Sequence, residues 1–293
     1  MIVIFGASGQ LGSAFRELLP AGAYIALNRE QADFSRPDLL PKILEKIMEV
    51  HRPLWIINAA AYTQVDLAEK EEDKALRINA ESPGILARWC AANQIPLIHF
   101  STDYVFSGIG TKPWQESDTA QPMNAYGRTK LAGEMAILAA GCDHLIFRSS
   151  WIYDRTGKNF LTTMQKVGVE KEAIRVVADQ MGAPTSAQDL ARAVIHILEV
   201  IEIRADLTFE SGIYHLCSSG ETSWHGFAEK IFETLRLQGV QLKVKSVIPI
   251  PASEYPSPAM RPKNSRMDCQ KVLHSFGVTM PSWEKGLISC LNA

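Results

Sequence analysis

Short apolar runs alternate along the chain with segments whose apolar residues recur at helical spacing. The apolar runs predict strands near residues 2–5, 23–27, 54–58, 96–101 and 144–148. The segments between them predict helices near 10–19, 37–50, 66–92 and 125–140, the third of them broken around Ser82-Pro83. Strands that alternate with helices favour a parallel sheet covered on both faces. Residues 1–150 are therefore expected to form a doubly wound α/β domain.

After Arg148 the alternation becomes less regular. Turns, a short helix and a strand over 174–178 are expected before Pro184, then a long helix over 187–203 and a strand over 212–217. The stretch from Ile248 to Arg266 is rich in Pro and Ser. We therefore expect a smaller C-terminal α/β domain from residues 151–181 and 217–293, with the chain returning to the first domain around 182–216.

The first predicted strand runs directly into three glycines, in the sequence GASGQLG over residues 6–12. A strand, a glycine turn and a helix start bring backbone close to a pyrophosphate and direct helix N-terminal amides at it. The GxxGxxG spacing differs from the simplest dinucleotide fingerprint, GxGxxG, and a turn without a ligand is the alternative. The turn predicts a Rossmann-type NAD(P)-binding site with the candidate residues Gly6, Ser8, Gly9, Gln10, Leu11 and Gly12.

A phenol and an ammonium lie four residues apart in the helix predicted over 125–140. Tyr126 and Lys130 therefore share one helical face. A nearby lysine charge is one of the few ways to make a phenol a competent proton donor or acceptor at neutral pH. YxxxK spacing also arises by chance on ordinary helix faces, so its significance depends on the glycine turn and on the Ser101-Thr102-Asp103 segment that follows a buried strand.

Composition agrees with a globular enzyme. The chain has 293 residues, 46% of them hydrophobic, and a formal charge of -2, which gives no bulk attraction to nucleic acid or to acidic membranes. Its five cysteines are scattered without a CxxC pair, so we expect reduced thiols rather than a zinc site or disulfide framework. No signal-type segment or membrane-spanning run is visible, so a cytoplasmic location is expected.

Seven segments together resemble the extended short-chain dehydrogenase/reductase family. The glycine turn and YxxxK identify only the superfamily, whereas STDYVF, RSSWIY and DQxGAPT narrow the resemblance to reductases of 4-keto nucleotide sugars. The resemblance covers almost the whole chain. Its carriers are GASGQLG at 6–12, NAAAYTQVDLAE at 58–69, STDYVFSG at 101–108, YGRTKLAGE at 126–134, RSSWIY at 148–153, DQMGAPT at 179–185 and MRPKNSRMD at 260–268.

The resemblance implies roles for four catalytic candidates. Tyr126 would protonate the C4 oxygen of a keto sugar, while Lys130 would lower the tyrosine pKa and bind the nicotinamide ribose. Thr102 would hydrogen-bond the carbonyl, although it could merely cap a turn. Asp103 is followed by Tyr104, where related 4,6-dehydratases carry a glutamate, so reduction is favoured over elimination. A turn-forming role for Asp103 is equally consistent.

On the cofactor side, the resemblance places small residues after the third strand and an Asp-Phe pair beside the adenine. The small residues are Ala59, Ala60 and Ala61, which Tyr62 follows, and the Asp-Phe pair is Asp33 and Phe34. The second strand ends in Leu27-Asn28-Arg29, without the carboxylate of an NAD-selective site. Asn28 and Arg29 are therefore expected to favour NADPH, with Arg29 facing the 2′-phosphate. NADH use and a solvated arginine are the alternatives.

For the substrate, the resemblance implies a dTDP-sugar. Trp151 would lie beside the sugar ring, although a tryptophan is more often core, and Gln180, Pro184 and Thr185 match a stretch near the substrate site. Arg261 and Lys263 would donate to the diphosphate unless they are exposed loop cations. Thr102 and Asp103 would contact the sugar as well.

The oligomeric state, a metal site and other functions of the same fold are considered next for this chain. A homodimer is possible; some relatives dimerise through a magnesium site of C-terminal carboxylates, but residues 281–293 carry only Glu284, so no metal is predicted. The alternatives are an epimerase or dehydratase of the same fold, or a non-catalytic subunit similar to the regulatory β subunit of methionine adenosyltransferase.

Overall fold

A six-stranded parallel sheet forms the centre of the larger lobe, which we call the sheet lobe. The computed structural model describes residues 1–203 and 209–292. The strand order is β2-β1-β3-β4-β5-β10, which confirms the predicted doubly wound α/β class. Because β2 and β3 flank β1, the loops after β1 and β3 are expected to diverge and to form a ligand-binding crevice at the carboxyl ends of the strands. The strands are β1 (Ile2–Phe5), β2 (Tyr24–Leu27), β3 (Trp55–Asn58), β4 (Leu97–Thr102), β5 (His144–Ser149) and β10 (Gly212–His215).

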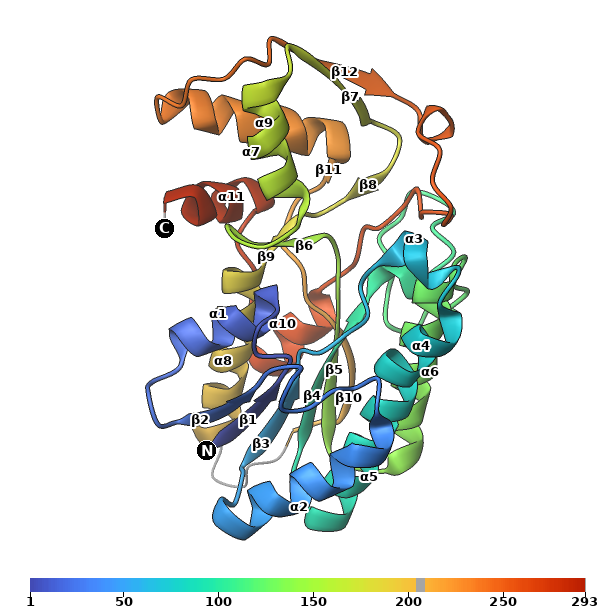
Figure 1. Cartoon of the computed structure of the whole chain (residues 1–293), viewed down its shortest axis with the longest axis vertical. Coiled ribbons are helices and arrows are strands. Elements are labelled where there is room, and N and C mark those ends of the chain that lie inside the picture. The colour runs from blue at the N-terminus through green and yellow to red at the C-terminus, as the bar shows by residue number, and fades with distance from the viewer. Residues whose placement is uncertain (204–208, 293) are drawn as a thin grey trace.

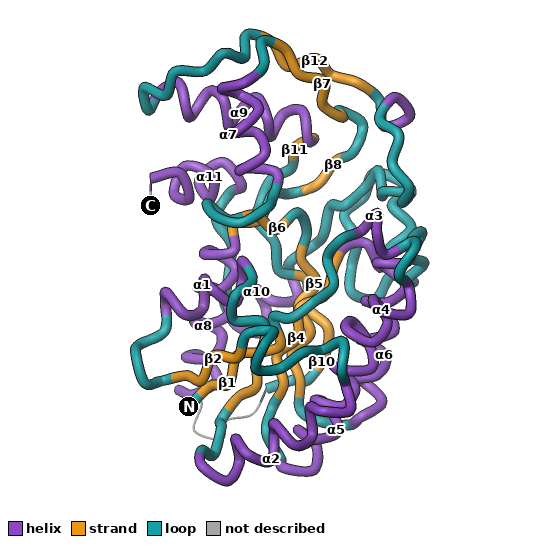
Figure 2. The backbone as a smooth tube through the Cα atoms, in the orientation of Figure 1, coloured by secondary structure: helices purple, strands orange, loops and turns teal. Residues whose placement is uncertain are grey.

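Helices cover both faces of this sheet, as Figures 1 and 2 show. One face packs against α1 (Gln10–Leu18), α8 (Ala187–Ile203) and α10 (Gln270–Phe276). The other packs against α2 (Leu40–Val50), α5 (Ser82–Asn93) and α6 (Ala125–Ala140). The sheet core therefore includes α8, β10 and α10, although all three follow residue 150. The short 3₁₀ turns η1 (Pro37–Leu39) and η3 (Asp103–Val105) complete the lobe.

The long helical stretch before β4 differs from its predicted form. It consists of α3 (Val65–Ala68), α4 (Glu72–Leu76), a π-helical turn η2 (Arg77–Glu81) and α5, so the break lies at residues 69–71 and not at Ser82-Pro83. Pro83 lacks the N–H that an α-helix would direct to Asn79 O. The π turn carries this carbonyl towards α6, where a Cβ on Gly133 would lie 2.0 Å from it.

The smaller lobe packs three helices around an aromatic core. These helices are α7 (Phe160–Glu170), α9 (Trp224–Leu237) and α11 (Trp283–Asn292), and Phe227 and Phe232 are fully buried between them. A strand within the Pro- and Ser-rich region, β12 (Ser246–Ile250), pairs in parallel with β7 (Ala173–Val177). The remaining elements are β6 (Ile152–Tyr153), β8 (Met181–Gly182), β9 (Thr185–Ser186), β11 (Thr222–Ser223) and η4 (Ala252–Glu254).

The carboxyl ends of the sheet strands face the smaller lobe (Figure 1). Among the described residues, no helix is both long enough and apolar enough to cross a membrane.

Candidate active site

The glycine turn after β1 requires glycine for close backbone contacts. Gly6 has a φ of +77°, and a Cβ there would lie 2.5 Å from the backbone nitrogen of Ala60. A Cβ at Gly12 would lie 2.2 Å from Gly6 O. The first turn of α1 therefore packs on the β1 turn, which in turn packs on the loop after β3. This is the close helix–strand packing of a dinucleotide site.

The N-terminus of α1 fits an anion. Gly9 is the N-cap residue and offers no side-chain cap, and the first turn of the helix carries no acidic residue. The first backbone amides of the helix therefore remain for a ligand, and the helix dipole favours negative charge there. Gln10 accepts a hydrogen bond from Asn159 Nδ2 at 3.0 Å, so this turn also contacts the smaller lobe. Ser8 is exposed and Leu11 is buried in the core.

The residues at the end of β2 are held by local hydrogen bonds. Asn28 Oδ1 accepts from the amides of Glu30 and Gln31. Arg29 Nε lies 3.6 Å from Asp33 Oδ1. Burial raises the pKa of Asp33, but hydrogen bonds from Ser35 and the Arg29 charge outweigh it and hold that pKa below its ordinary value. This ion pair lies directly after the end of β2.

Phe34 lies in the core and packs on Phe5 at 5.6 Å between ring centroids. The loop after β3 is held on the sheet, since Ala59 N donates to Phe5 O at 3.0 Å. Farther along this loop, the Tyr62 amide donates to Asn79 Oδ1 at 2.8 Å. The Tyr62 phenol donates to Glu71 at 3.0 Å.

Tyr126 is positioned by the way α6 begins. Asn124 caps the helix, accepting from Gly127 N at 2.8 Å, and Glu69 accepts from Ala125 N at 2.7 Å. A Cβ at Gly127 would lie 2.2 Å from the carbonyl oxygen of Tyr104. The glycine therefore allows the first turn of α6 to lie against the turn after β4, and the motif YGRTK brings its tyrosine to Thr102.

Thr102 both caps its turn and contacts the phenol. Its hydroxyl accepts from Tyr104 N at 3.2 Å and donates to Asp103 Oδ1 at 3.1 Å. Burial raises the pKa of Tyr126, and a hydrogen bond with Thr102 lowers it in part. This net direction is opposite to the one expected from Lys130. Burial is the main reason, and the Lys130 ammonium instead donates to Phe100 O at 2.6 Å.

Asp103 is a buried carboxyl group. It begins the turn η3, and the residue is 1% exposed. Burial raises the pKa of Asp103 to about 7, although hydrogen bonds from Ser265 and Thr102 oppose this. Asp103 therefore presents a carboxyl group close to neutrality beside Tyr126 and Thr102.

Lys130 lies in a buried chain of polar groups that sequence reasoning missed. Its Nζ is 3.2 Å from His99 Nε2, and His99 Nδ1 is 2.9 Å from Asn58 Nδ2. Asn58 Oδ1 accepts from Ala60 N, so the chain reaches the loop after β3. Burial lowers the pKa of Lys130 to about 8, while the Glu134 charge raises it in part. Burial and the Lys130 charge also lower the pKa of His99. The signal for His99 was a single polar residue inside the apolar strand LIHF.

A buried ion pair lies behind this chain. Arg148 Nε and Nη2 donate to Glu134 at 2.9 and 2.6 Å, and Ser101 donates to the same carboxylate. Both charged side chains are at most 4% exposed. Because removing one partner would leave a buried charge, the pair fixes α6 on β5 in one register.

Trp151 has an unusual backbone, with a φ of +49°. Its ring stacks on Trp224 with the centroids 3.7 Å apart and the planes 12° from parallel. A tryptophan in the left-handed region is strained and is retained only where surrounding contacts hold it. Trp224 begins α9, far along the chain from the RSSWIY motif, and was not a predicted site residue. The pair lies where β5 leaves the sheet lobe and enters the smaller lobe.

The segments 179–185 and 260–268 are brought together as neighbours. Met181 N donates to Lys263 O at 2.8 Å, and Ser265 N donates to Met181 O at 2.7 Å. Gln180 is buried. Lys263 forms an ion pair with Asp179 at 3.0 Å. Pro184 and Thr185 are also buried, at the edge of the smaller lobe.

Arg261 bridges to the sheet lobe. Its Nη2 donates to Asp66 Oδ2 at 2.9 Å, and Asp66 also accepts from Ser257 at 2.6 Å. Both cations predicted for a diphosphate are thus held by carboxylates in this structure. Arg261 also lies beside the turn η3, because its charge and hydrogen bond lower the pKa of Tyr104, which burial raises to about 12.

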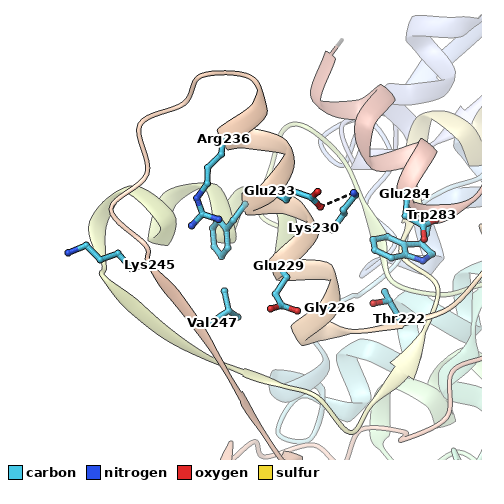
Figure 3. Close-up of a pocket in the computed structure, with 11 residues that line it drawn as sticks. Thr222, Gly226, Glu229, Lys230, Glu233, Arg236, Lys245, Val247, Trp283 and Glu284 are labelled. Carbon is cyan, nitrogen blue, oxygen red and sulfur yellow. Dashed lines mark hydrogen bonds and ion pairs between the residues drawn. The ribbon is translucent and has the colours of Figure 1, made fainter.

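A cavity of about 550 Å³ lies elsewhere, on the smaller lobe beside α9 (Figure 3). It is lined by charges of both signs, including Lys230 and Glu233, which pair at 2.8 Å. None of the predicted site residues lines it. In the described part of the chain, no three His, Cys, Asp or Glu side chains gather as a metal site requires.

The chain is similar to known proteins over its whole length. The family model described as RmlD substrate binding domain matches residues 1–293. A dTDP-4-dehydrorhamnose reductase of Burkholderia thailandensis is 41% identical, covering 99% of this chain and 98% of the relative. The reductase of Escherichia coli K12 is 41% identical, covering 99% and 97%. The crystal structure of the Bacillus anthracis reductase in complex with NADP has a TM-score of 0.88 at 35% identity, covering 99% and 98%.

Proposed function

This chain belongs to the family of the RmlD substrate binding domain, and we propose that it reduces the C4 keto group of dTDP-4-dehydro-L-rhamnose to give dTDP-L-rhamnose. It is an NAD(P)H-dependent oxidoreductase of dTDP-rhamnose synthesis, as its full-length relatives are named. The observation that supports this activity most directly is the meeting of Tyr126, Thr102 and Asp103 at the carboxyl end of β4.

The cofactor would lie across the glycine turn, with its pyrophosphate at the N-terminus of α1 and its nicotinamide towards Lys130. When bound, the reduced nicotinamide supplies the hydride for C4. Thr102 would orient the keto oxygen, and Tyr126 would deliver the proton that the developing alkoxide needs. Burial raises the pKa of the phenol, so it is protonated at neutral pH but is a weaker acid than an ordinary tyrosine. Asp103 and Arg261 would hold the sugar and its diphosphate.

We assign NADPH as the preferred cofactor, because Arg29 and not a carboxylate stands at the end of β2. The purified protein should use NADPH at least as well as NADH. Arg29→Asp should lower kcat/KM for NADPH while leaving that for NADH nearly unchanged. A wild-type preference for NADH of more than ~10-fold, which corresponds to about 1.4 kcal/mol, would contradict this assignment.

We further propose that the sheet lobe holds the cofactor, that the smaller lobe and the 260–268 segment hold the sugar, and that the enzyme works in the cytoplasm without a metal. A homodimer remains compatible with this arrangement, and analytical ultracentrifugation would measure it.

The decisive assay is oxidation of the reduced cofactor, followed at 340 nm, with dTDP-4-dehydro-L-rhamnose present and absent. Substrate-dependent oxidation with dTDP-L-rhamnose as the identified product is the expected result. A folded protein that binds NADPH but oxidises none of it would favour a non-catalytic role. A product epimerised or dehydrated without net oxidation would instead indicate one of the other chemistries of this fold.

A further inference from the structure

Two thiols meet in a second cavity of the molecule. This cavity has a volume of about 420 Å³ and lies where the chain leaves β10 and where α10 begins. Cys217 and Cys269 both line it, and their sulfur atoms are 3.7 Å apart. The sequence places these cysteines 52 residues apart, so their scattered spacing concealed the pair. Cys217 is buried, whereas Cys269 is partly exposed. A small solute that enters the cavity therefore meets Cys269 first.

The contact between the two sulfur atoms makes them chemically unequal. A hydrogen bond from Cys217 lowers the pKa of Cys269, although burial opposes this shift. The same contact, together with burial, raises the pKa of Cys217. The thiolate is the form that peroxide oxidises, and a neighbouring thiol can resolve the product. Cys269 is thus the attacking sulfur and Cys217 the resolving one.

The other three cysteines lack this combination. Cys90 and Cys142 are buried together in the sheet lobe, and burial raises the pKa of both thiols, that of Cys142 to about 11. Burial raises the pKa of Cys290 to about 12. Inert thiols of this kind provide internal controls.

We propose that Cys217 and Cys269 form a peroxide-sensitive dithiol that closes to an intramolecular disulfide. The Cys269 thiolate attacks hydrogen peroxide, its O–O bond breaks, and the departing hydroxide takes up a proton to leave as water. Cys269 is then a sulfenic acid. Cys217 Sγ attacks Cys269 Sγ, its proton is lost, and the hydroxyl group leaves as a second water. Overall, two thiols are oxidised to one disulfide while one peroxide is reduced to two waters.

Disulfide closure would reach the substrate side of the active site. The sulfur atoms must approach from 3.7 Å to about 2 Å, which moves the two connections that carry them. Cys269 directly follows the 260–268 segment, and Cys217 is near enough to Asp103 for that carboxylate's charge to raise its pKa. We expect the oxidised enzyme to have a raised KM for the keto sugar. This consequence rests on the proposed function, whereas the thiol chemistry does not.

The test treats the full-length protein with hydrogen peroxide, removes the excess with catalase and counts thiols after denaturation. We expect the five thiols to fall to three, with a peptide containing Cys217 cross-linked to one containing Cys269, and dithiothreitol to restore all five. Retention of five thiols, or a cross-link between Cys90 and Cys142 instead, would overturn the proposal.

Two variants separate the steps, and Cys90→Ser serves as the control. Cys269→Ser should keep its four thiols under the same treatment. Cys217→Ser should trap the sulfenic acid on Cys269, which dimedone labels, and Cys90→Ser should still lose two thiols. Dimedone labelling of Cys269 in the wild type without any cross-link would contradict the resolving role of Cys217. Because these readouts do not require turnover, they hold even if the assigned substrate is wrong.

Discussion

Individual side chains at the end of β4 carry charges that their surroundings disfavour. Asp103 and Lys130 are both buried, and burial moves their pKa values towards neutrality from opposite directions, to about 7 and about 8. Tyr126 moves away from neutrality. The phenol therefore holds its proton at neutral pH, whereas the pKa values of Asp103 and Lys130 lie close to neutrality. Such shifts concentrate at functional sites.

Tyr126→Phe keeps the aromatic ring and its edge-on packing against Tyr104, whose centroid is 5.5 Å away. It removes only the proton donor. Because general acid catalysis typically contributes ~10²–10⁴-fold, kcat should fall by about that factor while NADPH binding and thermal stability persist. Tyr104→Phe, a hydroxyl deletion in the adjacent ring, serves as the control. A Tyr126→Phe enzyme within ~3-fold of wild type would fall outside that range and remove Tyr126 from the acid role.

Asp103→Asn tests the buried carboxyl through stability. The folded-state pKa of Asp103 is raised, so its contribution to the free energy of unfolding is present at low pH and is lost as pH rises to about 7. Asparagine is uncharged, so the variant avoids the cost of burying an ionised carboxylate above that pH. We expect the variant to gain on the order of 1–3 kcal/mol over wild type at pH 8 and little at pH 4, measured by denaturant unfolding, while turnover falls.

Asp33→Asn is the control, because its effect on the free energy of unfolding at pH 8 should have the opposite sign. Because the pKa of Asp33 is lowered, its stabilisation is present at neutral pH and is lost as pH falls through the folded pKa, so this variant should be less stable than wild type at pH 8. Equal loss of stability at pH 8 in both variants would show that Asp103 acts as a structural hydrogen-bond acceptor.

At the scale of elements, the periodic segments were predictable because each strand and helix has one strong apolar pattern. The glycine turn, the strands that end at Asn58 and Thr102, and α6 lie within one or two residues of their predicted positions. The π turn was not predictable from Ser82-Pro83, because the carbonyl that Pro83 cannot pair finds room only beside Gly133, which is distant in sequence. Likewise, His99 and Trp224 gain their roles from contacts across the fold.

Gly127→Ala tests the junction between α6 and η3. The added Cβ would lie 2.2 Å from a backbone oxygen, so α6 must shift at its first turn. Overpacking of this kind typically costs 1–3 kcal/mol, and the shift should move Tyr126 away from Thr102 and lower kcat more than it changes KM. Arg128→Ala, which breaks an exposed pair with Glu72 in the same turn, should change stability by at most about 1 kcal/mol. Full activity in a Gly127→Ala protein would show that α6 and η3 can accommodate the added methyl group without moving Tyr126.

At the scale of the whole molecule, side chains join two lobes between which the chain crosses several times. Asp66, on α3 of the sheet lobe, accepts hydrogen bonds from Ser257 and Arg261 of the C-terminal segment. Gln10 reaches Asn159 on the other side of the crevice. These bridges join residues far apart in the sequence, and no local pattern indicated them.

Arg261→Ala should therefore affect the substrate and not the cofactor. Loss of a charge-assisted hydrogen bond is worth about 1.5–3 kcal/mol, so KM for the dTDP-sugar should rise roughly 10- to 100-fold while the Kd for NADPH stays nearly constant. Lys245→Ala, which removes an exposed cation paired with Glu172, is the control. If Asp66→Asn raises KM as much as Arg261→Ala does, the arginine acts by holding the two lobes together; if it leaves KM unchanged, the arginine acts directly.

The stack of Trp151 on Trp224 has an optical consequence. Two nearly parallel indoles whose centroids are 3.7 Å apart lie close enough for their electronic transitions to couple, and this coupling depends on their spacing. One ring belongs to the connection that leaves β5 and the other to the first turn of α9. Any ligand that enters between the indoles or rotates one of them changes this coupling. The tryptophan absorption and circular dichroism of the protein therefore report on the boundary between its lobes.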